Sequence, residues 1–243
     1  MPLGILLLTF FASSAAYSAG RAPVRLQRRA LPPAMSWETA QPRVLLRLAA
    51  VGAAVGPFVD AVHNQALLEY DVLPVTLFGV AKTSLLVPPL LAVAYAVLGG
   101  AAPAAIEAVV VSGGKPTTTD LEPRGRALLA VASTVCIIKL SELLVVGGVP
   151  PPAALLLLFA LCLAQWRTLD GTLSSVLLAA AAAVAGPLAE LPIMYLGCWH
   201  YTAPDYFPLI TDAWAGLNVI TAPCYFAVTT DAIALGRWFS EPR

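Results

Sequence analysis

The clearest membrane-spanning segment covers residues 172–196, TLSSVLLAAAAAVAGPLAELPIMYL, in which Glu190 is the one charged side chain. A bilayer core of about 30 Å requires roughly 20 apolar residues in helical form, so this stretch is long enough to cross it. The whole chain has the same character, with 59% hydrophobic and 12% charged residues, against about 25% charged in soluble domains. The mean hydropathy is +0.80. The sequence therefore predicts an integral membrane protein.

Five further apolar stretches flank this segment, and the breaks between them are rich in Gly, Pro and charge, as at Gly99-Gly100. We expect an all-α fold, a polytopic membrane bundle of six transmembrane helices, with residues 41–243 as its single domain. The predicted spans are residues 44–59, 73–98, 127–148, 152–166, 172–196 and 213–236.

Charge is sorted between the two sides of the predicted bundle. One side carries arginines and one lysine: Arg21, Arg25, Arg28, Arg29, Arg43, Lys115, Arg124, Arg126, Arg167, Arg237 and Arg243. The other side carries no Lys or Arg but has Asp60, Glu69, Asp71, Asp205 and Asp212. By the positive-inside rule, both ends of the bundle should face the cytoplasm or its equivalent. The 14 basic and 14 acidic residues balance, so no nucleic-acid partner is expected.

The first forty residues differ from the rest. Residues 3–19 are apolar, and residues 20–36 contain four arginines and no acidic residue, so residues 1–40 are predicted to be a signal or targeting region, processed or disordered. Two interpretations fit the charge rule. One is a bipartite presequence, as in algae whose plastids lie behind an endomembrane. The other is an uncleaved signal anchor, which would add a seventh helix.

Several charged residues fall inside the predicted spans, where each costs roughly 2.5–3.5 kcal/mol on insertion scales. Lys139 and Glu142 are three residues apart, and we expect them to form an ion pair on one helix face. Glu190 and Asp231 either pair with Lys82 from another helix or line a polar cavity.

A second group of polar residues lies at the predicted boundary that lacks Lys and Arg. It comprises Asp60, His63, His200, Tyr201, Pro204 and Asp205. Two His and two Asp side chains could ligate a metal or relay protons. Interfacial hydrogen bonding is the favoured interpretation, because no metal-ligand spacing accompanies them. The four cysteines form no C-x-x-C pair, and we expect neither catalysis nor a cofactor or metal.

Ordered motifs resemble the insulin-induced gene (INSIG) family of sterol-regulatory membrane proteins. They are Val87-Pro88-Pro89, Trp166-Arg167-Thr168-Leu169-Asp170, Tyr201-Thr202-Ala203-Pro204-Asp205-Tyr206, Trp214 and Gly236-Arg237. The resemblance implies an endoplasmic-reticulum protein that binds a sterol or oxysterol in its bundle. It also implies retention of SCAP-like and HMG-CoA-reductase-like membrane proteins, with Asp170, and with it Trp166 and Thr168, at the partner-binding surface. Arg167 replaces the family's second Trp, and Lys115 is the one lysine in its loop.

A dry pocket with one or two polar groups would suit a sterol hydroxyl. The candidate ligand-binding residues are Thr76, Phe78, Thr83, Ser84, Asn218, Thr221 and Tyr225, although ordinary helix packing explains each of them equally well. The alternative function is an intramembrane enzyme or carrier for a lipid-like or terpenoid substrate, in a plastid membrane.

Overall fold

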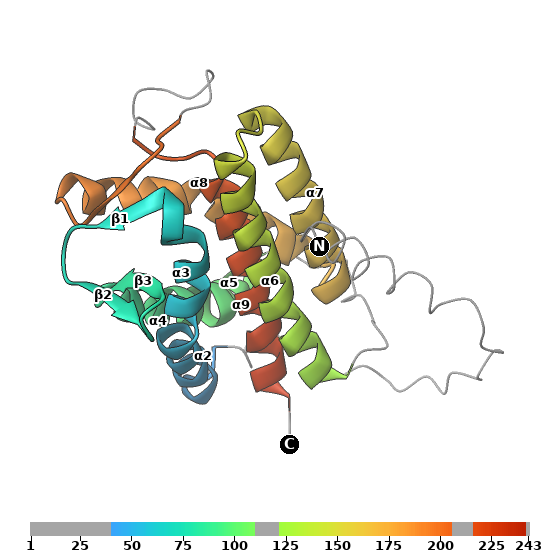
Figure 1. The fold of residues 1–243 in the computed structure, drawn as a ribbon. Coiled ribbons are helices and arrows are strands. Elements are labelled where there is room, and N and C mark those ends of the chain that lie inside the picture. Colours follow the sequence, from blue (N-terminus) through green and yellow to red (C-terminus); the bar gives the residue numbers. More distant parts are fainter. Residues whose placement is uncertain (1–39, 110–121, 206–215, 242–243) are drawn as a thin grey trace, which may run out of the picture. The chain divides into compact units, whose positions relative to one another are not determined.

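The computed structural model describes residues 40–109, 122–205 and 216–241, which are predominantly helical (Figure 1). The helices are α2 (Pro42–Ala54), α3 (Gly56–Leu67), α4 (Val87–Ala96), the π-helical η2 (Val97–Ala101), α5 (Ala102–Val109), α6 (Pro123–Val146), α7 (Pro151–Leu169), α8 (Leu173–Tyr195) and α9 (Thr221–Ser240). The strands are β1 (Leu68–Tyr70), β2 (Pro74–Leu77), β3 (Ala81–Ser84) and β4 (Trp199–Tyr201). The predicted targeting region lies outside the described residues apart from Ala40, as do Lys115, Tyr206, Asp212 and Trp214.

The predicted helical membrane bundle is confirmed. Five helical segments among the described residues are long and apolar enough to cross a membrane: Pro42–Leu67, Val87–Glu107, Arg124–Val146, Pro151–Leu169 and Leu173–Tyr195. The sixth predicted span corresponds to α9, which is less apolar because it carries threonines, Asp231 and Arg237. It lies beside α6 and packs against α2, α6, α7, α8 and η2 (Figure 1). A helix enclosed by other helices does not need an apolar surface for lipid, so α9 can belong to the bundle although it is less apolar. The predicted count of six spans is therefore approximate, with five meeting the length and composition expected of a span.

The second span differs from its predicted limits. Residues 73–86 do not begin the helix, because β2 and β3 form an antiparallel hairpin that turns at Phe78 (φ 50°) and Gly79 (φ 73°). Helix α4 begins at Val87, with Pro88 and Pro89 in its first turn. Proline lacks a backbone N–H, and the N–H groups of a first turn have no partner within the helix, so nothing is lost there. Helical structure then continues through the Gly99-Gly100 pair, which we had predicted to be a break, as far as Val109.

Two glycines allow this helix to cross α9 at close range. A Cβ on Gly236 of α9 would lie 1.9 Å from the carbonyl oxygen of Gly99, and a Cβ on Gly99 would lie 2.3 Å from that of Ala232. The two backbones therefore touch, as in small-residue crossings between membrane helices. The wider turn of η2 lies at this crossing.

The first span is longer than predicted and is divided. It runs from Pro42 to Leu67 rather than from 44 to 59, and α2 and α3 meet at Val55. Pro57 lies in the first turn of α3 and has no N–H to continue the hydrogen bonds of α2.

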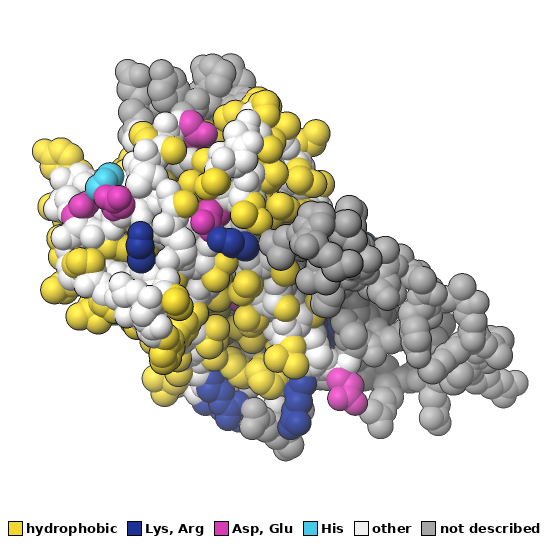
Figure 2. Space-filling model, viewed as in Figure 1, with side chains coloured by type: hydrophobic (Ala, Val, Ile, Leu, Met, Phe, Trp, Pro, Cys, Tyr) yellow, Lys and Arg dark blue, Asp and Glu magenta, His cyan; other side chains and the backbone are white. Residues whose placement is uncertain are grey.

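Strands β1 and β4 join the segments that follow α3 and α8. They pair antiparallel, with Leu68 opposite Tyr201, Glu69 opposite His200 and Tyr70 opposite Trp199. Figure 2 shows Lys and Arg side chains where α2 and α6 begin and others midway along this face, whereas the His and its acidic neighbours lie near β1. The β1–β4 pair therefore closes the acidic end of the bundle over the helix interior.

Candidate functional site

A partly open cavity of about 160 Å³ lies beneath the β1–β4 pair. Residues from α3, α4, α6, α8 and α9 enclose it together with the two strands. They are Gly56, Val59, Asp60, His63, Asn64, Leu68, Tyr70, Val87, Leu90, Leu91, Tyr95, Ile138, Glu190, Trp199, Tyr201, Thr221, Cys224, Tyr225 and Val228. Most of this surface is apolar, with a few polar groups that converge, which is the usual composition of a small-molecule site.

Asp60 is the first polar centre of the cavity. Its Oδ1 accepts a hydrogen bond from Nδ2 of Asn64 at 2.8 Å, and its Oδ2 accepts one from the Tyr70 hydroxyl. The same Asn64 amide also donates to the Tyr70 oxygen at 2.8 Å. Burial beside the Asp60 charge raises the pKa of the Tyr70 phenol above its ordinary value, so Tyr70 keeps its proton and remains a donor.

Glu190 is the second centre, and two phenols hold it. Tyr201 donates to Oε2 and Tyr225 to Oε1, each at 2.8 Å, and Thr221 donates to the Tyr201 oxygen at 3.2 Å. Gly186 gives the Tyr225 ring its space, because a Cβ there would lie 2.3 Å from the ring. Two aromatic donors from different elements thus fix a buried carboxylate beside the cavity.

His63 is bonded across the bundle to α6. Its Nδ1 lies 3.0 Å from the Ser141 hydroxyl oxygen, and that hydroxyl donates its own proton to the Ile138 carbonyl at 2.6 Å. Nδ1 is therefore the protonated nitrogen of the neutral ring, and Nε2 carries the lone pair. Within the described part of the chain, neither His63 Nε2 nor Asn64 Oδ1 has a hydrogen-bond partner, although both side chains are more than nine-tenths buried.

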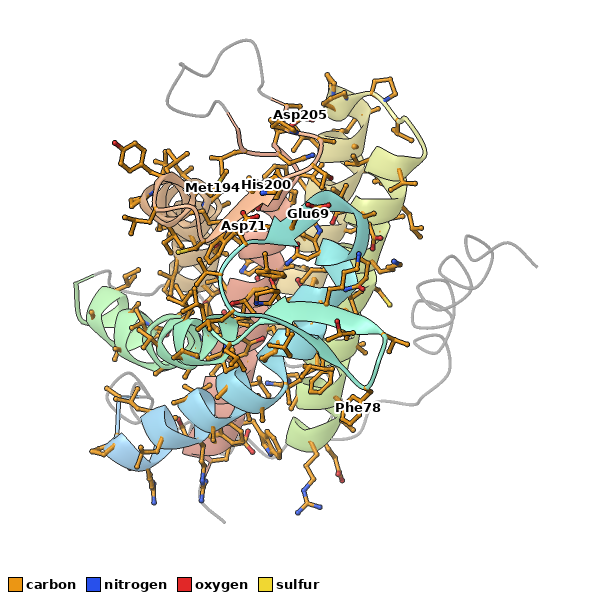
Figure 3. The ribbon with its side chains drawn as sticks, turned by 60° about the vertical axis from the view of Figure 1, so that its left-hand side comes forward. Glu69, Asp71, Phe78, Met194, His200 and Asp205 are labelled. Atoms are coloured by element: carbon orange, nitrogen blue, oxygen red, sulfur yellow. The ribbon has the colours of Figure 1, made fainter. Side chains whose placement is uncertain are left out.

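The polar residues predicted at the acidic boundary do not form one constellation. Asp60, His63 and Tyr201 line the cavity. His200 points outward, with Nδ1 2.8 Å from Asp71 and Nε2 3.7 Å from Glu69 (Figure 3). The hydrogen bond to the Asp71 carboxylate raises the pKa of His200 above its ordinary value.

Asp205 and Pro204 belong to the segment after β4. Asp205 accepts a hydrogen bond from the Val219 N–H at 2.7 Å, and its partial burial raises the pKa of its carboxyl group. Pro204 is exposed in the same segment. Within residues 40–109, 122–205 and 216–241, no group of three or more His, Cys, Asp and Glu side chains could hold a metal ion. The metal alternative therefore has no support from this arrangement.

The charged residues predicted inside the spans have different surroundings in the structure. The Lys139–Glu142 pair is confirmed, with Nζ 2.5 Å from Oε2. The predicted pairing of Lys82 with Glu190 or Asp231 is wrong, because Lys82 is exposed on β3. Asp231 instead accepts a hydrogen bond from Tyr95 at 2.8 Å, and Glu190 lines the polar cavity that we had given as the alternative.

The structure separates the predicted ligand-binding residues. Thr221 and Tyr225 line the cavity, whereas Thr76 and Phe78 are exposed on the β2–β3 hairpin, with the Phe78 ring stacked on Phe58. Figure 3 places Phe78 well away from His200. The remaining three, Thr83, Ser84 and Asn218, are buried outside the cavity lining. The side chains of Ser84 and Asn218 donate to main-chain carbonyl groups. The binding role of all seven residues stays a prediction.

Sequence reasoning missed Tyr70, Asn64 and Trp199. Tyr70 and Asn64 lie close in sequence to Asp60 and His63 at the predicted boundary. Asn64 follows Asp60 by four residues, and this helical spacing could have predicted that the two side chains meet. Trp199 lies next to His200, but nothing local indicated that β4 would pair with β1 and bring it over the cavity.

The opposite end of the bundle holds the predicted partner-binding residues. Asp170 is fully buried, with Oδ1 2.5 Å from Arg237 Nε, and it also accepts from the Thr172 hydroxyl. The indole N–H of Trp166 donates to the Thr172 carbonyl at 3.0 Å. Thr168 is exposed and donates to the carbonyl of Ala164 in its own helix. Arg237 also pairs with Glu107 at 3.2 Å, so this network joins α5, α7 and α9.

Two crystal structures resemble this chain. One is a mycobacterial Insig homolog, MvINS from Mycobacterium vanbaalenii, at 25% identity and a TM-score of 0.57, covering 79% of this chain and 91% of that one. The other is a cross-linked MvINS trimer, at 24% identity and a TM-score of 0.59, covering 80% of this chain and 93% of that one. No protein-family model matches the sequence, and no curated relative matches it.

Both neighbours are mycobacterial proteins, which gives no support to the algal source suggested by the presequence interpretation. The fold likeness agrees with the ordered motifs at Val87, Trp166 and Tyr201, and with the helical membrane bundle observed here. This chain is an Insig-like membrane protein in its fold.

Proposed function

We propose that this protein is a non-enzymatic regulator of the Insig type, which binds a sterol-like lipid in the cavity beneath β1 and β4 and retains partner membrane proteins. The observation that carries the proposal is the cavity itself, an apolar pocket with converging polar groups inside a bundle of Insig fold. We also propose an endoplasmic-reticulum membrane location and SCAP-like or HMG-CoA-reductase-like partners, as the family resemblance implies.

The size of the cavity limits how a lipid enters. A volume of about 160 Å³ is close to that of the apolar cavity of roughly 150 Å³ that holds one benzene molecule in an engineered lysozyme. The cavity therefore receives one end of a sterol rather than the whole molecule. The polar end of the lipid reaches Thr221 and the phenols, while its apolar body extends along Leu90 and Leu91 of α4.

The ion pairs of Asp170 with Arg237 and of Arg237 with Glu107 contribute to partner binding indirectly, by positioning the helix end. The Asp170 carboxylate is buried against Arg237, so it positions the end of α7 instead of touching a partner. The side chains exposed on that helix end are Arg167 and Thr168. A partner helix would meet this exposed edge.

Binding is tested on purified protein in nanodiscs with a photo-crosslinkable sterol, competed by unlabelled sterol. We expect saturable labelling that Val59→Trp abolishes, because Val59 lines the cavity and the larger ring fills it. Val93→Trp is the matched control, since Val93 is 64% exposed on α4. Thr221→Val, which barely changes volume but removes the hydroxyl that donates to Tyr201, should weaken labelling and lower the free energy of unfolding by only about 0.5–1.5 kcal/mol. Labelling that does not saturate, or that Val59→Trp leaves intact while the protein stays folded, contradicts the proposal.

A further inference from the structure

The hydrogen-bonding groups that line the cavity are unequally divided between donors and acceptors. The phenol of Tyr70 donates to Asp60, and those of Tyr201 and Tyr225 donate to Glu190. Tyr95 donates to Asp231, and the Thr221 hydroxyl donates to Tyr201. The hydroxyl protons around the cavity are therefore all engaged with protein acceptors.

Of the three buried side-chain atoms in the described cavity lining that have no hydrogen-bond partner, two are acceptors. Asn64 Oδ1 is one, and its orientation is fixed because Nδ2 faces a carboxylate oxygen of Asp60 that can only accept. His63 Nε2 is another, because Nδ1 holds the ring proton. The third is a donor, the indole N–H of Trp199, which lies close enough to Glu190 to act on that carboxylate.

Charge is unbalanced in the same direction. Asp60 and Glu190 are close enough to interact electrostatically, and no Lys or Arg is among the described residues lining the cavity. Lys139 on α6 is held by Glu142 at 2.5 Å. Two buried carboxylates without a basic partner are costly in an apolar interior, and a cation supplied from outside removes that cost.

We infer that the polar end of this cavity is a site for a protonated primary amine carried by an amphiphile with an apolar tail. The inference rests on the proposed function, since it names the headgroup that the cavity accepts. A primary ammonium has donors and no acceptor, which matches Asp60, Glu190, Asn64 Oδ1 and His63 Nε2. The aromatic walls formed by Tyr95 and Trp199 also attract a cation.

Other headgroups fit this site less well. A hydroxyl offers a single proton, and its lone pairs would face those of Asn64 and His63. A phosphate or carboxylate would place a third negative charge beside Asp60 and Glu190, with no positive side chain in the lining to offset it. The cavity should therefore rank headgroups as amine, then alcohol, then carboxylate.

The test uses the full-length protein in phosphatidylcholine nanodiscs and three amphiphiles with the same tail: hexadecylamine, hexadecanol and hexadecanoate. Radiolabelled hexadecylamine should bind saturably, and unlabelled amine should displace it at a concentration at least about tenfold lower than hexadecanol. Such a ratio corresponds to about 1.4 kcal/mol. Hexadecanoate should not compete. Equal competition by the alcohol, or any stronger competition by the carboxylate, overturns the inference.

Variants separate this site from general membrane partitioning. Asp60→Asn and Glu190→Gln should each weaken amine binding by about tenfold or more and leave hexadecanol binding nearly unchanged, because they remove charge but little volume. Glu122→Gln is the control, since Glu122 is exposed outside the cavity. Two variants guard against one of them misfolding. Amine binding that both folded variants retain in full would overturn the inference.

The outcomes also separate this inference from the proposed function. Saturable sterol binding without a preference for the amine removes the inference alone. Amine binding without sterol binding removes the sterol proposal alone. If neither ligand saturates, both are wrong.

Discussion

Arg237 in the last turn of α9 forms a buried ion pair with Asp170 at the end of α7, with Nε 2.5 Å from Oδ1. Glu107 completes the arrangement at 3.2 Å from the same guanidinium, so one arginine ties three helices together at the basic end of the bundle. Removing one member of a buried pair leaves the other charge without compensation, which is far more costly than losing an exposed pair.

Asp170→Asn should therefore lower the free energy of unfolding by about 3–5 kcal/mol. Melting in detergent, followed by scanning fluorimetry, measures the change. Thr168→Ala is the control, because Thr168 is exposed and bonds within its own helix. The double variant Asp170→Asn/Arg237→Gln should recover part of the loss. A single variant as stable as the wild type would mean that the pair does not hold α7 and α9 together.

Gly236→Ala should destabilise the bundle, because the new methyl group would meet the Gly99 carbonyl oxygen at 1.9 Å. Overpacking costs typically about 1–3 kcal/mol, and a backbone neighbour yields less than a side chain. Gly125→Ala introduces the same atom in α6 with nothing within 4 Å, and should be neutral or slightly stabilising. Equal melting temperatures for the two variants would argue against the close crossing of η2 and α9.

The His200–Asp71 pair predicts a dependence of stability on pH. The carboxylate of Asp71 raises the pKa of His200 in the folded state, so protonation favours the folded β1–β4 pairing. This contribution is fully present below the ordinary His pKa of 6.5 and is lost as the pH rises through the raised value. The effect is small, because both side chains are about half exposed.

The measurement compares the melting temperature of the wild type with that of His200→Gln between about pH 5 and about pH 8, the range in which histidine titrates. The wild-type advantage should shrink as the pH rises, and the variant should lack this trend. Parallel profiles for the two proteins would show that His200 does not contribute.

The arrangement of the helices predicts that Thr202 and Thr168 face opposite sides of the membrane. Both residues are exposed, one after β4 and the other in the last turn of α7. In a variant without the four native cysteines, Thr202→Cys and Thr168→Cys should react with a membrane-impermeant maleimide from opposite sides of sealed vesicles. Labelling of both from one side would contradict the alternating order of the spans and the orientation inferred from the arginines.

Much of the fold was predictable because of uninterrupted apolar runs. Helices α6, α7 and α8 lie within a few residues of their predicted limits, since Gly and Pro mark their ends at Gly147 and Pro151. The β2–β3 hairpin was not predicted, because Val75, Leu77 and Val80 run on into the apolar helix that follows and were counted with its span. Lys82 was the local warning, since a hairpin exposes it where a span would bury it.

The cavity was only partly predictable, because its contacts join residues distant in sequence. Asp60 and His63 could be selected as polar residues near a boundary, but the bond of His63 to Ser141 depends on how α3 packs against α6. The Arg237–Asp170 pair is similar. Both residues were predicted on the same side of the membrane, but their helices had to be neighbours before they could meet.

The β2–β3 hairpin also constrains the surrounding bilayer. A two-stranded sheet has outer edges whose N–H and C=O groups need partners from outside the sheet, unlike those of a helix. The Gln65 side chain of α3 supplies partners for the N–H and C=O of Lys82 on β3. Water, lipid headgroups or another polypeptide must meet the edge groups that the protein itself does not satisfy. The membrane around this protein is expected to be indented on that flank, which shortens the path from the headgroup layer to the bundle interior.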